Sequence, residues 1–483
     1  MRLLSSFVKD WKFEIPSPSG RVVDVAVIIM LLSLGGFWFQ VASARYESFA
    51  FRTGDTAVAE QAIWNTVHGR FLYQSFLGTE SNLSEHVSLI QLLYVPFYAV
   101  VPHTLTLFTV IQLCILIGAF FWYRFAKQRI GTVGALLSVG IFLLHPLTGS
   151  QAVQDMHVVA IAGPAFLMLL ASYHEGRNRP FIFWCFVMAL MAEFVIPTLF
   201  LVGVLAAWDR RGWKWIVPPI VFSVALLYAA KRLITIGAGS TENILTRLSP
   251  DSLLAMEKPK KRFGLVSESL APLLWIFPWF SKYSILLVPS ILIALFVIVP
   301  GRIGGGNHVF ILIPPVLSII VLDLYERFPK RRKWISALAL VGIAISVPTL
   351  VNRMQVDGSD LVDAMTRAES AIKDGGSLTA SSQFGTHLNR REEFYLPFNE
   401  VMTDYAVLKL SKTREEEDGN NQDSYDGRLV ASGEYREVFR EGRVVVFAKK
   451  SKIAELTEIP IEIVGTLDEY ALLKSWNAVK RGN

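Results

Sequence analysis

Long apolar runs alternate with short polar segments, many of them basic, along the first 351 residues of the chain. About eleven of these runs suit helices that cross a lipid bilayer, whose apolar core favours uninterrupted hydrophobic helices. The pattern therefore predicts an α-helical polytopic membrane protein. The predicted spans are 24–42, 105–123, 134–144, 158–173, 181–192, 194–208, 215–230, 265–280, 284–300, 309–324 and 335–351.

The polar stretch between the first two spans also shows helical periodicity. Within residues 56–67, Ala59, Ile63 and Val67 fall on one face, which favours an amphipathic helix on the membrane surface. Residues 86–101 are apolar but short for a span and contain Pro96, which suits a second interfacial or re-entrant helix. We therefore expect a loop over residues 43–103 that carries two interfacial helices.

The placement of Lys and Arg predicts how the protein is oriented. Four basic residues precede the first span, which favours a cytoplasmic N-terminus. The basic clusters at 124–129, 209–214 and 327–333 then fall on the same side, and only the basic loop 231–262 does not. The expected location is the cell (plasma) membrane, with the C-terminal residues external.

The last part of the chain has the composition of a soluble α/β domain. Residues 378–381 and 405–410 have the pattern of strands, and 435–449 that of a hairpin that turns at Glu441-Gly442. Residues 413–426 are polar, and we expect a loop there. The predicted domains are thus a transmembrane domain, 1–351, and a soluble domain, 352–483.

Composition narrows the class of protein further. The 483 residues are 52% hydrophobic and 18% charged, whereas soluble domains carry about 25% charged residues. Despite a net charge of +6, the chain has no motif of a nucleic-acid-binding fold, so no nucleic-acid partner is expected. Cys114 and Cys185 both lie in apolar runs, where a packing role is expected.

Polar side chains next to apolar runs collect on the predicted external side. Such groups are costly to remove from water, so their presence indicates function. Solvation in a loop is the alternative for Glu60 and Glu85, and helix capping is the alternative for Asp55. Glu193 has apolar neighbours on both sides, so solvation explains it less well. The whole set is Asp55, Glu60, Gln61, Glu85, His86, Asp155, His157, Glu193 and His308.

Two groups of residues have the chemistry to bind ions. Asp155 and His157, together with Glu193, are a possible site for a divalent cation, with Mn or Zn suiting the mixed ligands and Mg suiting carboxylates alone. Arg247 and Lys258 lie in the basic loop and have the charge to hold a phosphate or a lipid headgroup.

Several short motifs together resemble a prokaryotic family of predicted membrane proteins of unknown function (DUF2079). The Gln-x-x-Trp-Asn-Thr element is the most specific of them, and the resemblance extends over nearly the whole chain. The motifs are Asp55, Glu60-Gln61, Trp64-Asn65-Thr66, Gly69, His86, Pro96, Pro102, Asp155, His157, Glu193, His387-Leu388, Arg390-Arg391 and Asp404-Tyr405.

That family resembles the GT-C class of glycosyltransferases, which take a sugar from a polyprenyl-phosphate carrier at the outer face of the membrane. The resemblance implies that Asp55 is a general base or a carboxylate near a metal, and that His86 and Glu193 line the same cavity. It also implies a lipid-linked sugar donor and membrane lipids as partners, and Mg or Mn as a possible cofactor. The residues expected to bind substrate are Glu60, Gln61, Trp64, Asn65, Arg247, Lys258 and His308.

The chain departs from the family pattern at the hairpin tip, where Lys-Glu-Asp is expected and Ala192-Glu193-Phe194 stands. Two other functions therefore stay open beside the transferase. A transporter would need polar residues at mid-membrane and broken helices related by a repeat. A non-catalytic scaffold or sensor would use the external domain to bind a partner.

Overall fold

The computed structural model describes residues 18–51, 54–76, 78, 80–84, 86–238, 259–293, 295, 310–372, 375–410 and 422–455. The chain divides into two compact units. The first, which we call the membrane unit, comprises Met1–Tyr46, Ala62–Tyr73 and Thr79–Asp357. The second, which we call the C-terminal unit, comprises Glu47–Gln61, Gln74–Gly78 and Gly358–Asn483.

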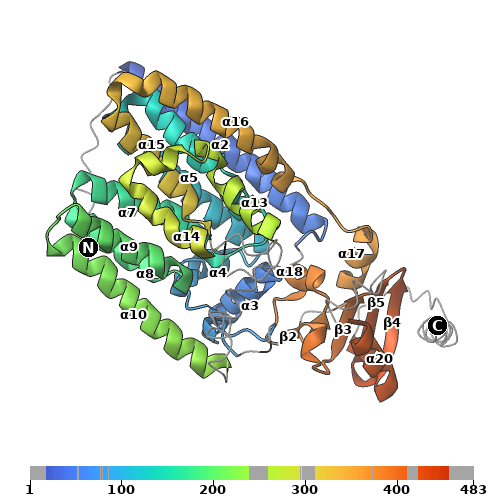
Figure 1. Ribbon diagram of the computed structural model, residues 1–483. Helices are drawn as coiled ribbons and strands as arrows, with labels where there is room; N and C mark the ends of the chain where they lie inside the picture. The colour runs from blue at the N-terminus through green and yellow to red at the C-terminus, as the bar shows by residue number, and fades with distance from the viewer. Residues whose placement is uncertain are drawn as a thin grey trace. The chain divides into compact units, whose positions relative to one another are not determined.

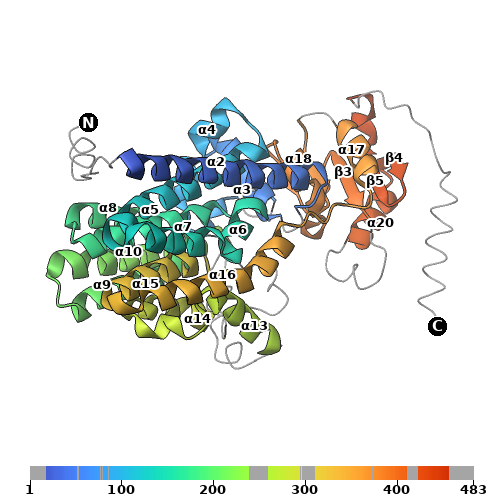
Figure 2. The same ribbon diagram turned by 90° about the horizontal axis from the view of Figure 1, so that it is seen from above.

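The membrane unit is a bundle of helices that run side by side (Figures 1 and 2). This confirms the prediction of an α-helical polytopic protein. Its main helices are α2 (Pro18–Glu47), α4 (Val95–Val100), α5 (Thr104–Leu143), α6 (Pro146–Val153), α7 (Ala162–Glu175), α8 (Asn178–Ala189), α9 (Ile196–Trp208), α10 (Trp213–Ala238), α13 (Pro259–Leu270), α14 (Val288–Leu292), α15 (Ile313–Arg327) and α16 (Arg332–Met354).

Length and apolar composition identify five described helical segments that can cross a membrane. They are Arg21–Glu47, Thr104–Leu143, Val158–Glu175, Trp213–Arg232 and Pro329–Met354. Three shorter apolar helical segments accompany them: Leu89–Val100, Glu193–Trp208 and Lys282–Leu292.

Close approach of α5 and α7 depends on a glycine. A Cβ atom on Gly118 would lie 2.4 Å from the Cβ of Pro164, so no larger residue fits between the two helices as they stand. The helix pairs α5 with α15, α7 with α8 and α9 with α10 also pack directly against each other.

The structure differs from the predicted spans in three places. Residues 124–133 were expected to form a loop, but α5 continues through them with one break at Gly131, whose φ is 77°. The predicted loop 145–157 contains α6. The predicted span 265–280 is broken after α13, where Leu274 and Trp275 adopt positive φ and a 3₁₀ turn (η6, Phe277–Phe280) follows.

Proline explains the broken span, because Pro272 and Pro278 each remove a backbone donor from the helix and obstruct the preceding turn. The predicted external loop 231–262 is shorter than expected, since α10 extends to Ala238 and α13 starts at Pro259. Residues 239–258 and 296–309 lie outside the described residues, and so do the second half of the predicted span 284–300 and the predicted loop 301–307.

Polar contacts within the membrane unit join segments that the sequence places on the same side of the membrane. On the predicted inner side, Lys127 Nζ lies 2.6 Å from Asp24 Oδ1, and His174 Nε2 lies 2.9 Å from Glu326 Oε2. On the predicted outer side, Arg353 donates to Ser150 Oγ at 3.0 Å. The relative sides of these segments therefore agree with the prediction, and the direction of the whole bundle stays a prediction.

The C-terminal unit contains a five-stranded mixed sheet in the order β2-β1-β3-β5-β4 (Figure 1). β1 is parallel to β2 and β3, and β5 is antiparallel to β3 and β4. Its elements are α17 (Val362–Ser370), β1 (Leu378–Ala380), α18 (Gly385–Leu388), β2 (Phe394–Tyr395), β3 (Tyr405–Lys409), α20 (Gln422–Ser432), β4 (Tyr435–Glu441) and β5 (Val444–Lys449).

The strand predictions for this unit are confirmed, including the turn at Glu441-Gly442, where Gly442 has a φ of 56°. The loop predicted over 413–426 is wrong at its end, because α20 begins at Gln422. Tyr425 and Leu429 of that helix are fully buried against the sheet, so tertiary packing outweighs the polar local sequence. Residues 411–421 lie outside the described residues.

The first part of α3 (Asp55–Val67) belongs to the C-terminal unit, whereas the sequence assigned the whole of 43–103 to the membrane domain. The side-chain amide of Gln61 explains the difference. Its Oε1 accepts from the backbone N–H groups of Ser75 and Phe76 at 3.1 and 3.2 Å, and its Nε2 donates to Ser75 Oγ at 3.0 Å. The Phe76 ring then stacks on Phe394 with centroids 5.2 Å apart.

Cysteine labelling in intact cells tests the predicted orientation. In a background without Cys114 and Cys185, we expect Lys450→Cys to react with a membrane-impermeant maleimide applied from outside, because exposed Lys450 lies in the predicted external domain. The matched variant Lys330→Cys, exposed on the predicted inner side, should react only after the membrane is opened. The reverse pattern would overturn the topology.

Candidate active site

Glu193 and His86 form a hydrogen-bonded pair at the tip of the hairpin made by α8 and α9. Glu193 starts the 3₁₀ turn η4 (Glu193–Val195), which separates the two helices. His86 Nδ1 donates to Glu193 Oε1 at 2.6 Å, and the backbone N–H of Val87 donates to Oε2 at 3.3 Å. The carboxylate therefore orients the His86 imidazole through its Nδ1 atom.

The electrostatics of the pair favour an ionised carboxylate. Burial by itself would raise the pKa of Glu193, but the charge and hydrogen bond of His86, with backbone N–H donors, lower that pKa below its ordinary value. The His86 side chain is 48% exposed and the Glu193 side chain 26%, so the carboxylate is the more buried member of the pair. A carboxylate in that place orients the ring and stabilises its protonated form.

His157 lies near enough to this pair to respond to its charge. It directly precedes the 3₁₀ turn η3 (Val158–Ile161). Burial lowers the pKa of His157 to about 3, and the positive charge of His86 adds to that effect. His157 is therefore a neutral imidazole at neutral pH.

The predicted cation site gains no support. Within the described part of the chain, no three or more His, Cys, Asp or Glu side chains are grouped so that they could hold a metal ion. Asp155, His157 and Glu193, the ligands that the sequence suggested, do not form such a group. Metal binding by these two residues stays a prediction.

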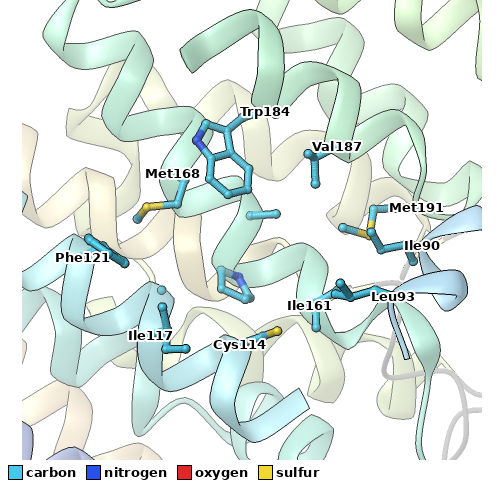
Figure 3. Close-up of a pocket in the computed structure, with 13 residues that line it drawn as sticks. Ile90, Leu93, Cys114, Ile117, Phe121, Ile161, Met168, Trp184, Val187 and Met191 are labelled. Atoms are coloured by element: carbon cyan, nitrogen blue, oxygen red, sulfur yellow. The ribbon is translucent and has the colours of Figure 1, made fainter. Parts of the chain in front are cut away.

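An apolar cavity of about 550 Å³ lies within the membrane unit (Figure 3). Side chains of α5, α7, α8 and the 3₁₀ turn η2 (Leu89–Leu93) surround it, and the Trp184 indole projects among them. The lining residues are Ile90, Leu93, Cys114, Ile117, Gly118, Phe121, Ile161, Pro164, Ala165, Met168, Trp184, Val187 and Met191.

The cavity and the ionisable pair are built from the same two segments. Ile90, four residues after His86, and Met191, two residues before Glu193, both line the cavity. The backbone N–H of Ile90 donates to the carbonyl of Leu190 at 2.8 Å, which fixes the two segments to each other. The arrangement therefore joins an apolar chamber to a polar tip, as an amphiphilic ligand requires.

Two buried polar groups in the segment after His86 have no hydrogen-bond partner among the described residues: Ser88 Oγ and Gln91 Nε2. Gln91 uses its Oε1 to accept from Asn82 Nδ2 at 2.8 Å. Buried polar atoms in native proteins are rarely left unpaired without a reason, and a ligand is one such reason. The sequence analysis missed these two residues because Ser and Gln inside an apolar run give no signal of their own.

The cavity lining was also missed. Apolar runs of bilayer length show that a helix is hydrophobic, but they do not show which of its faces meets a cavity instead of lipid. Trp184 and Met168 are ordinary apolar positions in the sequence, and only packing brings them together.

Four residues predicted to bind substrate make contacts within the protein. Glu60 and Gln61 are fully buried, and Glu60 Oε2 accepts from Asn389 Nδ2 at 3.1 Å. Buried Asn65 donates to the carbonyl of Tyr73 at 3.3 Å, and Trp64 stacks on His68 with centroids 3.9 Å apart. These contacts help to hold α3 and its neighbouring loop, and substrate binding by the four residues stays a prediction.

Asp55 is the first residue of α3 and belongs to the C-terminal unit, so its predicted approach to Glu193 stays a prediction. The predicted substrate residues Arg247, Lys258 and His308 lie outside the described residues.

The lowered pKa of His157 predicts how stability depends on pH. Because the folded protein holds this imidazole neutral and the unfolded chain protonates it near pH 6.5, stability should fall as the pH drops below about 6.5, by up to about 1 kcal/mol per pH unit. Thermal unfolding of purified wild type and His157→Gln, compared from pH 7.5 to 5, measures this. The variant should lose less stability on acidification, and parallel pH profiles would contradict the prediction.

Comparison with solved structures finds the same architecture. The crystal structure of ArnT from Cupriavidus metallidurans bound to undecaprenyl phosphate aligns with a TM-score of 0.58 at 12% sequence identity, over 89% of this chain and 98% of that chain. At that identity the likeness establishes a shared fold.

A search of curated proteins finds no match to this chain. Its sequence does match the family described as "Predicted membrane protein (DUF2079)" over residues 45–409, which is most of its length. That range includes the hairpin tip, the cavity lining and the sheet up to the end of β3, so the chain belongs to the DUF2079 family of predicted membrane proteins.

Proposed function

We propose that this chain is a membrane glycosyltransferase of the GT-C type, which transfers a sugar from a polyprenyl-phosphate donor to an acceptor at the outer face of the membrane. The observation that carries the proposal is the apolar cavity whose lining segments also present the His86–Glu193 pair. A polyprenyl chain is apolar and its phosphate is anionic, so the two ends of such a donor match the two parts of this site.

The fold supports the same proposal. ArnT, to which this chain is structurally similar, is described in complex with undecaprenyl phosphate. The cavity here is lined almost wholly by aliphatic and aromatic side chains and has a volume of about 550 Å³, which suits several isoprene units. A transporter would instead need polar groups along a central pathway, and the described lining of this cavity offers only the Cys114 thiol and the Trp184 indole N–H.

The proposed reaction is a displacement at the anomeric carbon of the sugar. The oxygen of an acceptor hydroxyl forms a bond to that carbon, the bond between the carbon and the phosphate oxygen breaks, and polyprenyl phosphate leaves with the electron pair. His86, held by Glu193, would donate from Nε2 to the phosphate and so neutralise charge as it develops. Ser88 and Gln91 are further candidate donors to the phosphate.

The hydroxyl proton must go to a base, and we propose Asp55 for this role, as the resemblance to GT-C enzymes implies. A carboxylate is a competent base for a hydroxyl that loses its proton as the new bond forms. We assign phosphate neutralisation to His86 in preference to Mg or Mn, because Asp155 and His157 are too few ligands for a metal site of the ordinary kind.

A bulky residue placed in the cavity should block the donor. Ile117 lines the cavity but is 53% exposed, so Ile117→Trp should reduce binding of polyprenyl phosphate about tenfold with little cost to folding. Leu113, one turn earlier on α5 and 47% exposed, does not line the cavity, and Leu113→Trp is the matched control. Binding is measured with a radiolabelled lipid on the purified full chain. Equal binding of polyprenyl phosphate by both variants would show that the cavity does not bind the donor.

Loss of the Asp55 charge should abolish transfer and leave the protein folded. Asp55 lies in the first turn of α3, where Asn loses only the favourable interaction of the charge with the helix dipole, so Asp55→Asn should cost under about 1 kcal/mol of stability, while the missing base should slow transfer about a hundredfold or more. Asp363→Asn makes the same change in the first turn of α17 and serves as the control. Transfer from a polyprenyl-phosphate sugar and thermal stability are measured side by side in membranes. Normal turnover by Asp55→Asn would remove Asp55 from the mechanism.

A further inference from the structure

Five exposed cations lie within seven residues where α15 is connected to α16. The connection runs through the 3₁₀ turn η11 (Pro329–Arg331), and α16 follows it directly as a candidate membrane span. We call this segment the basic turn. Its cations are Arg327, Lys330, Arg331, Arg332 and Lys333.

One cation of the basic turn, Arg327, is paired with a carboxylate, since it lies 3.4 Å from Asp323 Oδ2. Asp323 accepts from Ser281 Oγ at 2.7 Å, and Glu326 accepts from His174 at 2.9 Å. Among the described residues, no carboxylate forms an ion pair with Lys330, Arg331 or Lys333. The turn therefore presents positive charge that the described part of the protein does not neutralise.

Exposed aromatic side chains lie beside these cations. Arg327 donates to the carbonyl of Phe280 at 2.9 Å, which holds the 3₁₀ turn η6 against the end of α15. Trp279 is 59% and Phe280 is 55% exposed, and Trp334, the residue after the basic turn, is 72% exposed. Tryptophan concentrates where the apolar core of a bilayer meets its headgroups, so the basic turn lies at the depth of the headgroups.

We propose that the basic turn is a binding site for the headgroup of an anionic phospholipid. Four or more Lys and Arg residues directly beside a membrane span attract anionic lipids strongly, and the exposed aromatic residues offer a surface for the upper part of the acyl chains. Charge complementarity selects this occupant, because a zwitterionic headgroup brings no net charge to balance the cations. The inference does not depend on the glycosyltransferase proposal.

The cations of the basic turn are more closely clustered than other exposed cations on the predicted inner side. Arg179, Arg210 and Lys214 are also exposed on the predicted inner side, at the ends of α8, α9 and α10. Arg179 lies near the start of α8, and Arg210 and Lys214 lie at the connection between α9 and α10, so these three charges are dispersed over two places, whereas the five cations of the basic turn lie in one. If the basic turn is a lipid-binding site, removal of three of its charges should weaken lipid binding more than removal of three dispersed charges from the same side of the membrane.

Lipid binding to the purified full chain tests the proposal. Phosphatidylglycerol and phosphatidylcholine are titrated into the detergent-solubilised protein, and bound lipid is counted by native mass spectrometry. Wild type should bind phosphatidylglycerol about tenfold more tightly than phosphatidylcholine, and Lys330→Gln/Arg331→Gln/Lys333→Gln should lose most of that preference. Arg179→Gln/Arg210→Gln/Lys214→Gln has the same net charge and should keep the preference.

Three results would overturn the proposal. Equal loss in both triple variants would show attraction by overall charge, and absence of any preference in wild type would show no anionic-lipid site. Displacement of phosphatidylglycerol by millimolar inorganic phosphate at constant ionic strength would show a site for free phosphate. A thermal unfolding scan of each variant in detergent confirms that folded proteins are compared.

Discussion

The hydrogen bond between His86 and Glu193 is the interaction on which the candidate active site depends. An ionised carboxylate between two apolar helices is costly unless a positive charge and hydrogen-bond donors compensate for the lost water. His86 and the Val87 N–H supply that compensation at the hairpin tip. The same contact draws the segment of residues 86–93 onto α8, and this closes one wall of the apolar cavity.

The candidate active site combines apolar helices with polar residues at the ends of those helices. The bilayer requires that α5, α7 and α8 be hydrophobic, and Gly118 lets the first two approach closely. An apolar cavity lies between these helices, and the His86–Glu193 pair lies at the tip of the hairpin made by α8 and α9. The apolar tail of an amphiphilic ligand therefore matches the cavity, and its charged head matches the polar hairpin tip.

The sequence predicted the elements whose signal is local, and it failed where tertiary packing decides. Apolar run length located α2, α7 and α16, and turn chemistry located the hairpin at Gly442. The resemblance implied that Glu193 and His86 line one cavity, but it did not predict their hydrogen bond. The two residues are 107 positions apart, and no periodicity in the sequence links them. The buried contacts of Glu60 and Gln61 were not predicted, since a polar residue in an amphipathic helix has the same appearance in sequence whether it binds a ligand or a buried group of the protein.

An experimental structure with a polyprenyl phosphate bound is the most direct test of this account. The account predicts density for the prenyl chain between Ile90, Ile117, Trp184 and Met191, with the phosphate within hydrogen-bonding distance of His86 Nε2. A phosphate bound away from His86, or a prenyl chain outside the cavity, would contradict the proposed donor site.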